Sequence, residues 1–196
     1  HEPAADLAIA AALLSARALG TMLADKSETP ALDEFRVARR REKELFAQIN
    51  QELVNTFVTA LEREDIEALA GALYKIPKTV EKFAERYALF ADRLTDIDYS
   101  SQAAMLARAS EVIVNMVGEL RKGFKLDVMH ALNERMQSIE SEADRLLLEL
   151  YRDLFADQAD AGKLMVRKDL FELLEKAIDR CRDAGNVIYQ IALKNS

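Results

Sequence analysis

Two pairs of acidic residues in the second half of the chain have a spacing that suits a metal site. Glu140 and Asp144 form one pair, and Glu175 and Asp179 form the other. Because residues four apart lie on one flank of an α-helix, each pair would present two carboxylates together. Asp183, one turn further on, could add another oxygen ligand. Hard oxygen ligands suit Mg, Ca, Mn or Fe better than a soft thiolate metal.

The two acidic pairs are predicted to face each other. They lie on consecutive predicted helices joined by a loop at 156–162, and opposite residues of an antiparallel helix pair have a constant sum of residue numbers. Glu140 with Asp179, and Asp144 with Glu175, have the same sum. Four carboxylates at close range repel one another unless protons, basic side chains or a cation intervene.

The same acids also fit a plainer interpretation, which stays open. Acids make up 34 of the 196 residues, so four-residue spacings arise often by chance on solvated helix faces. Arg145 and Arg182 are available as surface ion-pair partners.

Residues for other kinds of chemistry are scarce. His130 is the only internal histidine, and no nucleophile motif accompanies it. No Glu-x-x-His occurs, which removes a ferritin-like di-iron site. Glu172 and Glu175 form an ExxE, but the ExxD of helical pyrophosphohydrolases does not follow, and there is no Gly-rich phosphate loop. We therefore expect no enzymatic activity. A metal-dependent enzyme of unknown substrate is the competing class.

Composition narrows the remaining functions. The net charge of −7 argues against nucleic-acid binding and against an anionic membrane surface. The dense basic run within 36–43 is neutralised by Glu34, Glu42 and Glu44 and is interpreted as a charged helix face, with a nucleic-acid or phosphate patch as the alternative. The single cysteine, Cys181, lies on an apolar helix face, which predicts a buried thiol and is compatible with a reducing cytoplasm.

The Ala- and Leu-rich stretch at 4–22 resembles a secretory or membrane-spanning segment only superficially. Asp6 and Arg17 interrupt it, and no basic residues precede it. We interpret it as a buried helix, through which a purely structural bundle could oligomerise. A cytoplasmic protein that reaches a membrane only through a partner is the expectation.

Apolar residues at helical spacing predict an all-α fold with six helices. Gly and Pro are few, at six and three residues, and no segment shows sustained β alternation. Pro77 lies inside the third helix and is predicted to kink or divide it, whereas Gly123 is predicted to end the fourth. The six predicted helices lie at about 4–24, 30–61, 62–94, 101–122, 125–155 and 164–193.

The helix lengths and apolar stripes repeat between the two halves of the chain. A shift of 101 residues places the stripes in register, for example Leu45 on Leu146 and Leu73 on Leu174. We interpret this as two three-helix repeats, 1–94 and 99–196, that together form one compact domain. Under the same shift the four paired acids fall on Arg39, Lys43, Tyr74 and Lys78.

The chain resembles the PhoU-like family, in the branch described as phosphate transport regulators. The resemblance covers about 30–194 and rests on degenerate helical motifs at 63–66 (REDI), 139–144 (IESEAD) and 174–186 (LEKAIDRCRDAGN). It implies two three-helix bundles, and accessory roles towards Pit-type phosphate transporters or phosphate-response regulators. A non-enzymatic homo-oligomer is expected.

The resemblance also bears on metal binding, because acidic pairs in this family can bind metal clusters. Glu140, Asp144, Glu175 and Asp179 match those pairs. Their first-half counterparts, which are basic or phenolic, do not match. At most one of two ancestral metal sites is therefore predicted to survive, and loss of both stays open.

Overall fold

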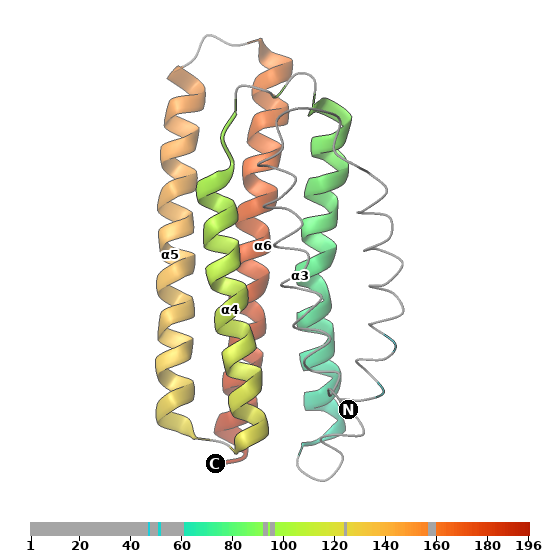
Figure 1. Cartoon of the computed structure of the whole chain (residues 1–196), viewed down its shortest axis with the longest axis vertical. Coiled ribbons are helices and arrows are strands. Elements are labelled where there is room, and N and C mark those ends of the chain that lie inside the picture. The colour runs from blue at the N-terminus through green and yellow to red at the C-terminus, as the bar shows by residue number, and fades with distance from the viewer. Residues whose placement is uncertain are drawn as a thin grey trace.

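The computed structural model describes residues 47, 51, 61–91, 94, 97–123, 125–156 and 160–196. Within them the protein is all-helical, as predicted, with four helices and no strand. The helices are α3 (Arg63–Phe90), α4 (Ser100–Lys122), α5 (Leu126–Ala156) and α6 (Ala161–Lys194), which run alternately up and down (Figure 1).

The first two predicted helices, at 4–24 and 30–61, lie outside the described residues. The internal repeat, with its two three-helix units at 1–94 and 99–196, therefore stays a prediction. The other four helices are present with ends close to those predicted.

Local sequence explains the end of α4 and the start of α6, and packing explains why α3 continues through a proline. Gly123 ends α4 with φ 121° and ψ 158°, a conformation essentially restricted to glycine, as the sequence predicted. Asp160 caps α6 by accepting a hydrogen bond from the Gly162 amide. Pro77 was predicted to kink or divide the third helix, and the division is wrong, because α3 continues through it. Leu73, Ile76 and Val80 around it are all buried, so packing offsets the hydrogen bond that proline cannot donate.

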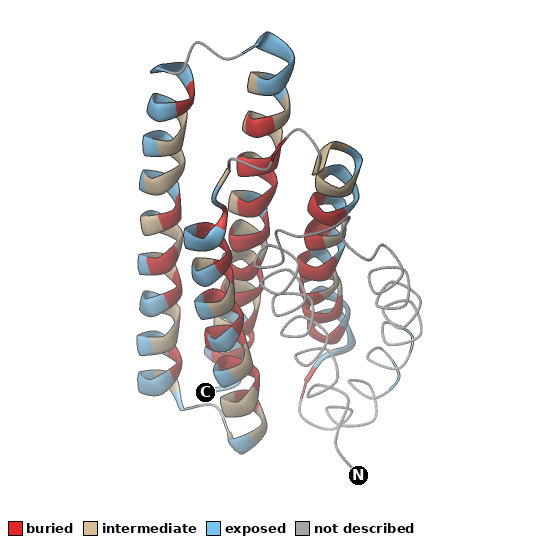
Figure 2. Ribbon diagram, turned by 45° about the horizontal axis from the view of Figure 1, so that its top comes forward, coloured by how far each residue is buried: buried red, intermediate tan, exposed pale blue. Residues whose placement is uncertain are grey.

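Helix α6 occupies the centre of the described bundle and packs against α3, α4 and α5. Its buried face includes Leu174, Ala177 and Cys181, each with no exposed surface. Figure 2 shows buried residues on the inward faces and exposed residues on the outer face of α5. The predicted burial of Cys181 is confirmed, and burial raises the pKa of its thiol to about 12.

Candidate functional site

The acidic residues lie along the contact between α5 and α6. Glu140 and Asp144 directly follow the buried residues Ile139 and Ala143 on α5, so they lie at the edge of the core. Glu175, Asp179 and Asp183 occupy successive turns of α6. Each carboxylate thus reaches solvent while its neighbour packs inward. We call these five residues the acid cluster.

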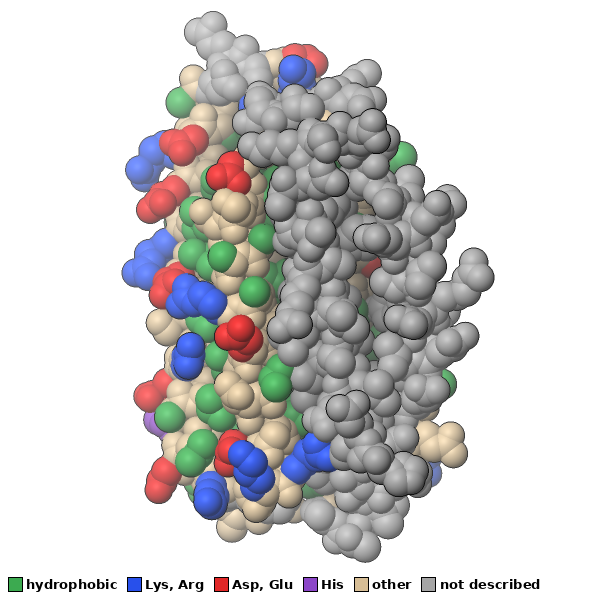
Figure 3. All heavy atoms as spheres, in the orientation of Figure 1, with side chains coloured by type: hydrophobic (Ala, Val, Ile, Leu, Met, Phe, Trp, Pro, Cys, Tyr) green, Lys and Arg blue, Asp and Glu red, His purple; other side chains and the backbone are tan. Residues whose placement is uncertain are grey.

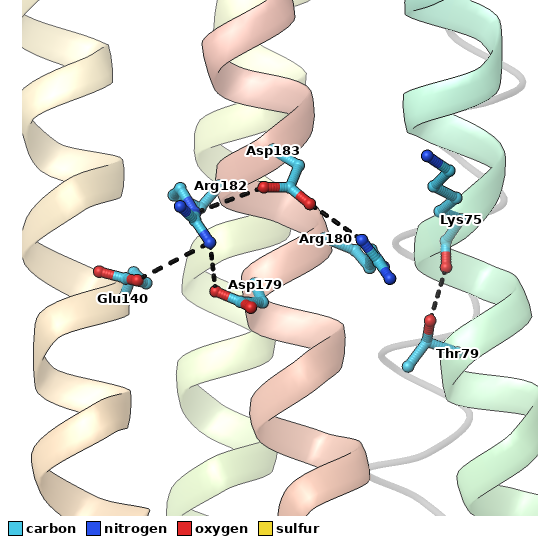
Figure 4. Close-up of polar contacts among 7 residues, drawn as sticks. All are labelled: Lys75, Thr79, Glu140, Asp179, Arg180, Arg182 and Asp183. Atoms are coloured by element: carbon cyan, nitrogen blue, oxygen red, sulfur yellow. Dashed lines mark hydrogen bonds and ion pairs between the residues drawn. The ribbon is translucent and has the colours of Figure 1, made fainter.

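One basic side chain, Arg182, lies inside the acid cluster and links the two helices. Its Nη2 donates to Asp179 Oδ1 at 2.7 Å and lies 4.0 Å from Glu140 Oε1. Its Nε lies 3.5 Å from Asp183 Oδ1, and Arg180 holds the other oxygen of Asp183 at 3.0 Å. Figure 4 shows Arg182 between Asp179 and Glu140, with Arg180 on the opposite side of α6, towards α3.

The carboxylates are close enough to shift one another's protonation. Burial and then Asp144 raise the pKa of Glu140, with smaller contributions from Asp179 and Asp183, while Arg182 opposes them. Burial, followed by Asp179, Asp144 and Glu140, raises the pKa of Glu175 to about 7. The four paired acids therefore interact, as their spacing predicted.

The register between α5 and α6 differs by about one helical turn from the one that the loop position predicted. Gln137 donates to Asn186, and Tyr151 donates to Glu172. In both contacts the two residue numbers add up to more than the constant sum predicted from the loop position. One cause is that helical side chains lean towards the N-terminus of their own helix. In an antiparallel pair, two side chains therefore touch when each belongs to a residue C-terminal to the one whose Cα lies directly opposite the partner helix position. In this register Glu140 lies across from Asp183, and Asp144 across from Asp179.

The acid cluster has the donor chemistry of a hard-metal site, but its carboxylates are not gathered around one point in this structure. Among the described residues, no group of three or more His, Cys, Asp or Glu side chains could hold a metal. Arg182 already supplies the positive charge beside Asp179 and Glu140. A cation here would have to displace that guanidinium.

The structure describes two of the four predicted first-half counterparts. Tyr74 and Lys78 lie one turn apart on α3, with Lys78 Nζ 5.7 Å from the centre of the Tyr74 ring. Arg39 and Lys43 lie outside the described residues. Lys78 belongs instead to a second feature, which the sequence analysis missed.

That feature is a cleft between α3 and α6 lined mainly by basic side chains. Lys75, Lys78, Lys82 and Arg86 recur at helical spacing along α3, which is the signal that could have revealed it. The sequence alone could not show that bases of α6 lie across from them. None of the described helices is long and apolar enough to cross a membrane.

Comparisons with known proteins show similarity, at low identity, to two proteins. It is 24% identical over 147 residues to the UPF0111 protein YkaA of Bacillus subtilis, covering 74% of this chain and 71% of that protein. It is 22% identical over 185 residues to a putative pit accessory protein of Rhizobium meliloti, covering 92% and 86% respectively. No protein-family model matches the chain. The two relatives are consistent with a PhoU-like, Pit accessory family.

Proposed function

We propose that the protein is a non-enzymatic accessory protein of phosphate transport, which acts in the cytoplasm on a Pit-type transporter or a phosphate-response regulator. The observation that carries the proposal is the similarity, along 92% of the chain, to a protein named as a putative pit accessory protein. The PhoU-like motifs of the sequence and the all-helical architecture agree with it. A homo-oligomeric state is part of the proposal.

A deletion strain of the source organism tests this role. Loss of the gene should change the rate of phosphate uptake, and the tagged protein should co-purify with the transporter or regulator. Unchanged uptake together with no association would contradict the proposal. Light scattering of the purified chain tests the oligomeric state, and a monomer at micromolar concentration would contradict it.

We also propose that the acid cluster binds a hard metal ion in competition with Arg182. Its predicted ligands are the four paired acids, Glu140, Asp144, Glu175 and Asp179, with Asp183 as an additional ligand. The metal would supply positive charge that joins α5 to α6. The support is the set of four mutually interacting carboxylates beside a single guanidinium. A helical bundle without metal is the alternative.

Elemental analysis after incubation with Mg, Mn, Ca or Fe and desalting distinguishes the two. Glu140→Ala/Asp179→Ala should lose the metal, and Arg182→Gln should retain at least as much as the natural chain. The control Glu149→Ala/Asp153→Ala removes two exposed acids of α5 outside the acid cluster and should leave the metal content unchanged. Metal content near zero in the natural chain and in Arg182→Gln would remove the metal proposal.

A further inference from the structure

The cleft between α3 and α6 has the size of a small-ligand site. Its volume is about 470 Å³, within the range of roughly 300–1,000 Å³ that is usual for such pockets. Its walls carry six basic side chains from two helices. These are Lys75, Lys78, Lys82 and Arg86 of α3, and Lys176 and Arg180 of α6.

The cleft has a surplus of positive charge. Two acidic residues, Asp169 and Glu172, also line it, so six bases against two acids leave a formal excess of four positive charges among the lining residues, of which Arg180 also pairs with Asp183 outside the cleft. Both acids are already engaged. Arg86 donates to Asp169, and Glu172 accepts from Lys168 and from the Tyr151 hydroxyl.

Three lysines of the cleft lack acidic partners. Among the described residues, no carboxylate forms an ion pair with Lys75, Lys78 or Lys82. All three are exposed. Within the described part of the chain, a ligand would therefore contact them without first breaking a salt bridge.

The register of the two helices sets like charges across from each other. Helices α3 and α6 are antiparallel: Lys194 donates to Asp65 at one end of the pair, and Arg86 donates to Asp169 at the other. In that register Lys78 falls across from Lys176, and Lys75 across from Arg180. Figure 4 shows Arg180 on the side of α6 that faces α3. Facing bases repel one another, and an anion between them would remove that repulsion.

The chemistry of the walls indicates what kind of anion fits. The bases of α3, from Lys75 to Arg86, extend over about 16 Å of helix. An elongated ligand with several charges would use this row, whereas a single phosphate ion would meet only part of it. Leu173 is the apolar side chain in the described lining, and no aromatic ring is there to stack on a nucleobase. Lysine ammonium and arginine guanidinium groups are the usual partners of phosphate oxygens.

We propose that this cleft binds a short oligophosphate, a chain of linked phosphate groups with about four negative charges. The phosphate chain is the shared chemistry of inorganic tripolyphosphate and of a nucleoside triphosphate. The charged walls favour the inorganic form. The proposal rests on the cleft alone and holds whether or not the protein acts on a phosphate transporter.

Isothermal titration of the full chain with tripolyphosphate, at fixed low ionic strength and without divalent metal, tests the proposal. Tripolyphosphate should bind at least tenfold more tightly than orthophosphate or citrate. ATP binding as tight as tripolyphosphate would assign the cleft to any phosphate chain, and weaker ATP binding would assign it to the inorganic form. Equal affinity for orthophosphate, or for citrate, would overturn the proposal.

Variants locate the binding. Lys78→Gln/Lys82→Gln, and separately Lys176→Gln, should weaken tripolyphosphate binding about tenfold or more, the usual cost of losing one charge-assisted contact. Lys125→Gln/Arg135→Gln removes two exposed charges near the start of α5 and should change affinity less than twofold. Circular dichroism would verify that each variant is folded. Equal weakening by both pairs would indicate diffuse attraction and would contradict a site in the cleft.

Discussion

Glu140 and Glu175 lie in the same acid cluster but have different basic neighbours. Arg182 is among the groups that lower the pKa of Glu140, whereas Lys176 has this effect on Glu175. Burial is the largest cause of the upward shift at both residues. The pKa of Glu175 is raised to about 7, so its charge changes near neutral pH.

Replacing Glu175 should reveal this as a pH-dependent change in stability. Because its folded pKa lies above the unfolded value near 4.5, its contribution to stability is complete below about pH 4.5 and is lost as the pH rises through about 7. Glu175→Gln stays neutral, so it should match the natural chain near pH 4.5 and be more stable by on the order of 1–3 kcal/mol at pH 8. Urea unfolding of the variant and the natural chain at the two pH values, in the presence of a chelator, measures these differences in stability.

The exposed Glu149 provides the control for this experiment, since Glu149→Gln should give the same difference from the natural chain at both pH values. A Glu175→Gln variant that is less stable than the natural chain at pH 8 would show that the carboxylate is stabilising, contrary to the shift.

At the scale of a single element, α4 has one glycine within it and another directly after its last residue, and the two have different roles. Gly123 ends the helix at positive φ, where a side chain is strained. Gly118 lies within the helix, and a Cβ added there would meet no atom within 4 Å. One glycine is needed by the backbone, and the other only weakens the helix.

Alanine at these two positions should therefore have opposite effects. Gly123→Ala should lower the free energy of unfolding by about 1–3 kcal/mol because it forces alanine into a glycine conformation. Gly118→Ala should raise it by about 0.5–1 kcal/mol because alanine favours the helix. Thermal unfolding of the two variants gives the comparison. Two changes of the same sign would contradict the assignment of Gly123 as the helix terminus.

At the scale of the whole molecule, α6 joins the described helices into one core. It contacts α3, α4 and α5, and both the acid cluster and the basic cleft use its side chains. The space-filling view in Figure 3 shows acidic and basic side chains alternating along the side of the molecule formed by α5. A cavity in the buried face of α6 should therefore weaken its packing against α3, α4 and α5 together.

Leu174 tests this dependence because it is fully buried on α6. Leu174→Ala should cost about 2–5 kcal/mol, the usual effect of a cavity in a core. Urea unfolding should show a lower midpoint with an unchanged slope. Leu148→Ala, at a leucine that is 64% exposed on α5, should cost much less. Similar losses at both positions would contradict a core centred on α6.

Apolar spacing was enough to predict α3 to α6, because each helix must bury one face. It could not show that α3 continues through Pro77, since that depends on the packing around Leu73, Ile76 and Val80. Four-residue spacing was likewise enough to predict that the paired acids interact.

The contact register and the basic cleft could not be predicted in the same way. Register depends on how side chains lean and on the shape of the loop, so it differed by about one turn. The cleft depends on Lys78 and Lys176 lining the same space from two helices that are distant in sequence. Each of these lysines, on its own helix, resembles ordinary solvated surface.

The α5–α6 hairpin becomes sparsely buried towards its loop. Between Ala143 and Arg167, Leu154 is the only buried residue that the structure describes, whereas α6 beyond Arg167 is buried at almost every turn. Backbone amides near this tip should therefore exchange with deuterium through local opening, and those around Ala177 only through global unfolding. Hydrogen exchange followed by mass spectrometry would show the hairpin losing protection progressively towards its loop.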